Sequence, residues 1–80
     1  MSKIEQVVEY CKKCIEGTNE VISALQADSK RAYERYLEDK KFFGEADKGE
    51  YLYLQDCIRV EKVRKSVYED ILKFIEEMEA

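Results

Sequence analysis

Two cysteines, Cys11 and Cys14 in the stretch EYCKKCIEG, are the residues of this chain whose types and spacing most suggest chemistry. Thiols three residues apart share one face of a helix, where they could supply two of the four ligands of a tetrahedral zinc site. Redox Cys-x-x-Cys pairs gain their reactivity at a helix N-terminus, whereas this pair lies inside a helical pattern. The sequence therefore favours core packing for both cysteines. A thiol-based metal or redox site shared across a dimer is the alternative.

No other residue set completes a metal or catalytic site. The third cysteine, Cys57, belongs to a distant part of the pattern, and the chain has no histidine, which is the usual general base. Carboxylates are abundant but interleave with lysines and arginines, and there is no glycine-rich phosphate loop. We therefore expect a protein that is not an enzyme and needs no cofactor or metal.

The composition predicts one small all-α domain. The 80 residues include no proline and only three glycines, so the chain has almost no turn punctuation. The net charge of −4 is mildly acidic, without the basic excess of a nucleic-acid binder. No apolar run is long enough to span a membrane. An odd number of cysteines without an export signal indicates a cytoplasmic protein.

The first helix is expected over residues 3–43. Ser2 followed by Glu5 is a capping-box pattern, and apolar residues then recur at helical spacing as far as Phe43. The helical phase is kept through the two plausible break points, Gly17 and Asp28. A break at either of these would instead give a three-helix bundle.

Gly44 supplies the stop, because a glycine after a helix is the usual left-handed C-cap. Asp47 and Glu50 form a second capping-box pattern after it. The sequence therefore predicts a tight turn over residues 44–47 and a second helix over residues 48–79.

The second helix carries two apolar stripes. A strict heptad pattern that is interrupted once, by Arg64, is here called the heptad seam and comprises Tyr53, Cys57, Val60, Arg64, Val67, Ile71, Phe74 and Met78. A second stripe, here called the flank, comprises Leu54, Ile58 and Leu72. We assign the heptad seam to packing on the first helix and leave the flank open.

Folding the two helices antiparallel about a tight turn pairs opposite charges across the hairpin. Asp28 then faces Arg64, and Arg35 faces Asp56, so these four residues are predicted to form two structural ion pairs that fix the register. Two helices alone bury little apolar surface, so we expect the hairpin to self-associate into a dimeric four-helix bundle.

Apolar residues near the turn and on the flank suggest a surface for another protein. The predicted partner-binding residues are Phe42, Tyr51, Leu52, Leu54, Ile58 and Leu72. The resulting hypothesis is a non-catalytic interaction module, such as a small adaptor, inhibitor or regulatory protein of phage or mobile-element type. Nucleic-acid binding through a central basic band that includes Lys30, Arg31 and Lys62 is a weaker alternative.

Overall fold

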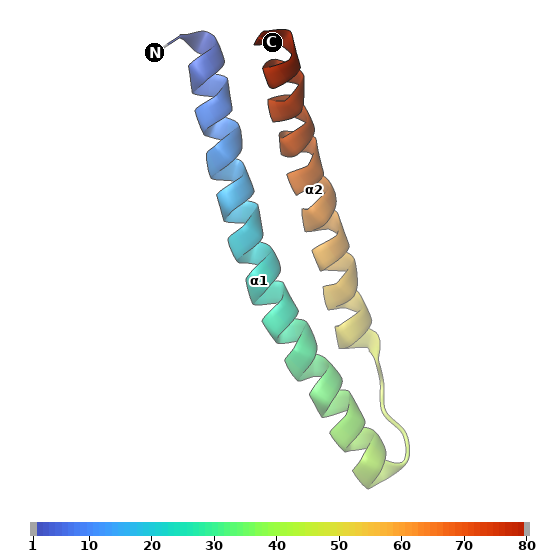
Figure 1. The fold of residues 1–80 in the computed structure, drawn as a ribbon. Helices are drawn as coiled ribbons and strands as arrows, with labels where there is room; N and C mark the ends of the chain where they lie inside the picture. The colour runs from blue at the N-terminus through green and yellow to red at the C-terminus, as the bar shows by residue number, and fades with distance from the viewer. Residues whose placement is uncertain (1, 80) are drawn as a thin grey trace.

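The computed structural model describes residues 2–79, which form two long helices packed against each other. Helix α1 spans Lys3–Phe43 and helix α2 spans Gly49–Glu79. The helices run antiparallel, so the first turn of α1 and the last turn of α2 lie side by side at one end of the rod (Figure 1). The rod measures 60 × 17 × 14 Å. The predicted all-α helical hairpin is therefore confirmed.

Helix α1 is continuous from end to end. The Ser2 hydroxyl accepts a hydrogen bond from the backbone N–H of Glu5 at 3.1 Å, which caps the first turn. The helix then passes through Gly17 and Asp28 without a break. The structure thus has two helices over its described residues, not the three of the alternative prediction.

The connection between the helices begins with a glycine cap and then runs back along α1. Gly44 adopts φ 76°, a left-handed conformation, and its N–H donates to the Lys40 carbonyl at 2.9 Å. The following residues rise beside α1 as an extended strap before α2 begins (Figure 1). The Asp47 carboxylate accepts a hydrogen bond from the N–H of Gly49 at 2.9 Å, at the start of α2.

The extended strap moves the register of the hairpin away from the tight-turn prediction. The Gln55 amide donates to the Ser29 hydroxyl at 2.6 Å, where a tight turn would place Lys62 opposite Ser29. This displacement of about seven residues corresponds to two helical turns. As a result, the last turns of α1 extend beyond the start of α2 and form a free end of the rod, here called the tip (Figure 1).

The contact between the helices buries mostly small side chains. The buried residues are Cys11, Thr18, Ile22, Ser29 and Ala32 on α1 and Ile58 on α2. The accessible surface is 6384 Å², whereas a compact monomer of this mass exposes about 5,000 Å². The radius of gyration is 18.4 Å, against about 12 Å for a compact domain of this length. A single hairpin therefore leaves much apolar surface in water.

Candidate interaction surface

The structure reverses the roles of the two apolar stripes on α2. The flank packs on α1: Ile58 is 5% exposed, and Leu54 and Leu72 are half-buried. The heptad seam faces solvent, with Val60 58% and Phe74 62% exposed. The flank also fits a heptad pattern, with spacings of four residues from Leu54 to Ile58 and fourteen from Ile58 to Leu72, so periodicity alone does not distinguish the two stripes. The side chains that α1 presents are mostly small, and the longer residues of the flank fill the space beside them.

The heptad seam shares one side of the rod with an edge of α1. A shallow groove of about 300 Å³ is lined by Cys14, Gly17 and Val21 from α1 and by Arg64 from α2. A second groove, of about 510 Å³, is lined by Leu25, Tyr53, Cys57 and Val60. These two grooves place the seam and the α1 edge on the same side, here called the open face. Its apolar side chains come from both helices.

Gly17 lies at this open face in the middle of α1. Apart from its chain neighbours and the backbone of its own helical turns, a Cβ atom added there would meet no atom within 4 Å. Glycine inside a helix costs about 1 kcal/mol relative to alanine, so the hairpin by itself gains nothing from this residue. A glycine on the outside of a helix does allow another backbone or a bulky side chain to approach closely.

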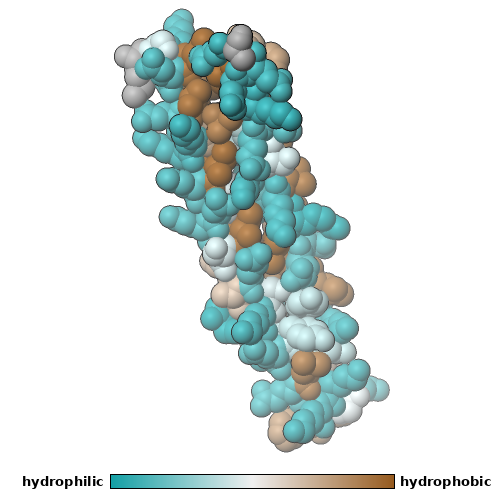
Figure 2. Space-filling model, viewed as in Figure 1, coloured by the Kyte–Doolittle hydropathy of each residue, from teal (hydrophilic) through white to brown (hydrophobic). Residues whose placement is uncertain are grey.

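Hydrophobic residues are not spread evenly over the rod. Figure 2 shows one side, where the surface is mostly hydrophilic and the hydrophobic residues gather mainly in the groove between the helices. The exposed apolar residues of the heptad seam form a far longer run than the isolated ones normal for a protein surface. This run is the main candidate for an interaction surface.

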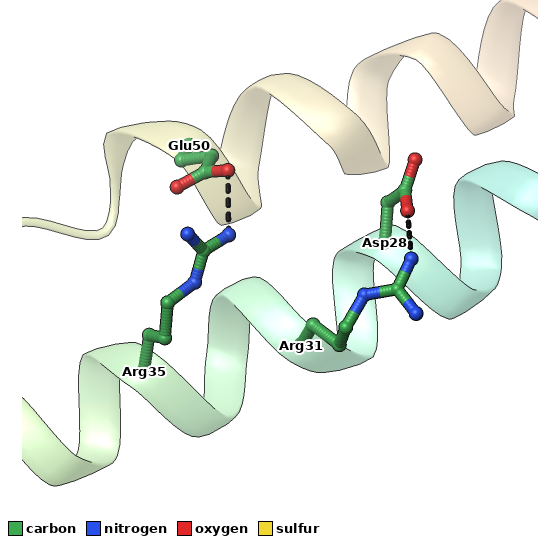
Figure 3. Close-up of polar contacts among 4 residues, drawn as sticks. All are labelled: Asp28, Arg31, Arg35 and Glu50. Atoms are coloured by element: carbon green, nitrogen blue, oxygen red, sulfur yellow. Dashed lines mark hydrogen bonds and ion pairs between the residues drawn. The ribbon is translucent and has the colours of Figure 1, made fainter.

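The two predicted cross-helix ion pairs are not formed among residues 2–79. Each of the four charges pairs elsewhere: Asp28 with Arg31, Arg35 with Glu50, Asp56 with Arg59, and Arg64 with Glu61. Figure 3 shows the first two of these pairs. The displaced register explains why the two predicted pairs do not form, because it moves their members about two helical turns apart. Of the ion pairs between described residues, only Arg35–Glu50, at 2.8 Å, joins the two helices. Exposed pairs of this kind contribute about 0–1 kcal/mol each.

The cysteines line the hairpin contact and the open face. Cys11 is buried, Cys14 and Cys57 are half-buried, and all three are free thiols. Cys57 lies beside Leu25, which is eleven residues from Cys14, or about 16 Å along the helix. Among residues 2–79, no three potential metal ligands of the His, Cys, Asp and Glu types come together.

Two tyrosines lie beside Cys14. The rings of Tyr10 and Tyr68 meet edge to face, with 6.4 Å between their centroids. Hydrogen bonding to the Cys14 side chain, and then the charge of its thiolate, raise the pKa of Tyr10 and of Tyr68 above 10. Cys57 raises the pKa of Tyr53 in the same way. These phenols are therefore neutral at physiological pH.

The predicted partner-binding residues near the turn separate into two groups. Tyr51 packs on Tyr33, with 5.0 Å between ring centroids, and is half-buried. Phe42 and Leu52 are exposed. Sequence reasoning missed Phe43, which continues the helical apolar pattern of α1 but is 78% exposed at the tip. No local signal could have shown this, because its exposure depends on the path of the strap.

The comparisons with known proteins give no family for this chain. No protein-family model, curated protein or solved structure matches it. Within residues 2–79, neither helix has a stretch apolar enough to cross a membrane.

Proposed function

We propose that this chain is a non-catalytic protein–protein interaction module: a small adaptor, inhibitor or regulatory protein that works through apolar helical surfaces. The observation that carries the proposal is the heptad seam, which runs the length of α2 and is left open to water. A seam of this type is the usual contact surface between helices of different chains. We further propose that one of its interactions is self-association into a dimeric four-helix bundle.

The tip supports a second contact, with a different protein. Phe42 and Phe43 are among the most exposed large apolar side chains of the chain. Exposed aromatic residues at a rigid end of a structure are typical anchors of protein interfaces. Covering the open face with a second copy would leave these two side chains free, and they therefore form the proposed site for the partner protein.

Several features support an interaction role over an enzyme or a nucleic-acid-binding protein. The grooves between the helices are shallow and open, and the chain has no histidine to act as a general base, which supports the non-enzymatic assignment. All four arginines, at positions 31, 35, 59 and 64, pair with carboxylates, which weakens the case for a basic band that binds phosphates. The three free cysteines support the proposed cytoplasmic location.

The test is capture from a lysate of the native host by immobilised protein, followed by mass spectrometry. The variant Phe42→Ser/Phe43→Ser removes both aromatic anchors at the tip. The matched control is Lys40→Ser/Lys41→Ser, which changes two neighbouring exposed residues. We expect a specific partner that the wild type and the control retain and the Phe variant loses. Equal capture by all three proteins would show that the tip is not the binding site.

A further inference from the structure

We infer that the open face is covered by a second copy of this chain, stacked so that the two tips lie at the same end and α2 of each copy packs on α1 of the other. This inference deepens the proposed function, since it specifies the geometry of the self-association. Four observations carry it: the area exposed, the charges beside the seam, the match of residue sizes across the two faces, and the position of Gly17.

The exposed area fits a dimer of this size. The accessible surface of 6384 Å² exceeds the compact-monomer value by about 1,300 Å². Each partner in a standard protein–protein interface gives up about 800 Å². One hairpin therefore has enough surplus surface to form a stable interface with another of its kind.

Two symmetric ways of stacking the open faces exist, and charge separates them. If the hairpins point in opposite directions, α2 lies on its own copy. Arg64 is the midpoint of α2 (Gly49–Glu79), so full overlap would place it against the partner's Arg64. Asp56 and Asp70, which directly precede the seam residues Cys57 and Ile71, would come within two residues of the same level across the interface. Like charges placed opposite one another disfavour this arrangement.

If the hairpins point in the same direction, α2 lies on α1 of the partner. Residues that are level with each other within one hairpin are then also level across the two copies. Gln55 is level with Ser29. Counting forward along α2 and back along α1 then places Val60 level with the partner's Ala24 and Val67 level with the partner's Gly17. Two branched side chains of the seam thus meet the two smallest residues at the edge of α1.

The same count brings further complementary residues together. Phe74 lies level with the partner's Tyr10, so an aromatic pair closes the seam toward the chain termini. Lys13 directly precedes Cys14 on the side of α1 that points away from α2, and Asp70 lies on the side of α2 that points away from α1. The count places Lys13 level with Ile71, one residue from Asp70. In this stacking each Lys13 therefore faces the partner's Asp70. Both side chains are exposed in the single hairpin and pair with no other residue within the described chain.

The parallel stacking has a consequence for the tip. The two copies of Phe42 and Phe43 come to one end of the bundle, where four phenylalanine side chains are exposed together. The proposed site for the partner protein is therefore built from both chains and is incomplete in a single hairpin.

The first test is the variant Gly17→Gln, with Ser23→Gln on the outer, exposed side of α1 as its matched control. Space is free around Gly17 in the hairpin, so the helix content of the variant should be unchanged or higher. We expect sedimentation equilibrium to show a wild-type dimer, a dissociation constant at least tenfold higher for Gly17→Gln, and no change for Ser23→Gln. Equal dissociation constants for the wild type and Gly17→Gln would overturn the stacking.

The second test reverses charges at low ionic strength. Lys13→Glu and Asp70→Lys should each weaken the dimer about tenfold, because each creates two like-charge contacts across the interface. The double variant should restore wild-type affinity, since both pairs are then re-formed with opposite polarity. Additive weakening in the double variant would overturn the parallel stacking while leaving self-association itself standing. A wild-type protein that stays monomeric at millimolar concentration would overturn self-association altogether. The capture experiment would still test separately whether the tip binds a partner protein.

Discussion

Ile58 and Val60 are two residues apart on α2 and lie in opposite environments. Ile58 is 5% exposed and packs against α1, whereas Val60 is 58% exposed on the open face. Residues two apart on a helix lie about 200° apart around its axis, so Val60 faces away from α1 when Ile58 faces it. A helix that buries one apolar stripe and exposes another is the arrangement found in bundles, where every helix has two neighbours.

Alanine substitutions at these two positions should therefore have very different effects on the dilute protein. Ile58→Ala removes most of a buried side chain and should lower the free energy of unfolding by about 2–4 kcal/mol. Val60→Ala removes exposed atoms and should change it by less than about 0.5 kcal/mol. Urea unfolding at low micromolar concentration, followed by circular dichroism at 222 nm, measures both.

Ile58→Val is the conservative companion, with an expected loss of about 1 kcal/mol, in case the alanine variant does not fold. If Ile58→Ala left the free energy of unfolding unchanged and Val60→Ala lowered it, the heptad seam, and not the flank, would pack on α1. At high protein concentration Val60→Ala should also lower the free energy of unfolding, because it then removes atoms from the interface between two copies.

The helices and their ends were predictable because their signals are local. Ser2 caps α1, Gly44 ends it in the left-handed conformation, and the Asp47 carboxylate accepts from the Gly49 N–H at the start of α2. Each of these depends on residues within a few positions along the chain. Within residues 2–79 the predicted capping box with Glu50 is not formed, because the Glu50 side chain pairs with Arg35. The continuity of α1 through Gly17 followed from helical periodicity, which extends well beyond a single weak residue.

The register and the choice of packing stripe were not predictable in the same way. Gly44 signals where α1 ends but not how far the next residues travel before α2 begins. Because they run back along α1, the whole of α2 moves by about two turns, and Asp28 and Arg64 find other partners. The two stripes of α2 have the same period, so their assignment depends on which side chains fit the small residues of α1.

The stability of the hairpin should decrease at alkaline pH because of its tyrosines. Hydrogen bonding to Cys14 raises the pKa of Tyr10 and Tyr68 in the folded state above the unfolded value of about 10. The unfolded chain therefore releases these phenolic protons at lower pH than the folded chain does. Their contribution is fully present below pH 10, and the free energy of unfolding falls as the pH rises beyond it.

Absorbance titration at 295 nm of the folded protein checks the cause of this effect. Cys14→Ala should lower the pKa of Tyr10 and Tyr68 toward 10, because it removes the largest source of the shift. Cys57→Ala is the matched control and should move only Tyr53. Unchanged titration curves for Cys14→Ala would show that the thiol does not govern these two phenols.

The reactivity of the three thiols should depend on protein concentration if a second copy covers the open face. Cys11 is buried in the single hairpin and should react slowly with a thiol reagent at every concentration. Cys14 and Cys57 are half-buried there and lie on the open face, so they should react quickly in dilute protein. At a protein concentration ten times the dissociation constant, mass action leaves about a fifth of the chains monomeric. The labelling rates of Cys14 and Cys57 should therefore fall about fivefold.

Mass spectrometry of labelled peptides resolves the three sites. The Gly17→Gln variant should keep the fast rates throughout, whereas rates for Cys14 and Cys57 that are independent of concentration in the wild type would mean that the open face stays uncovered.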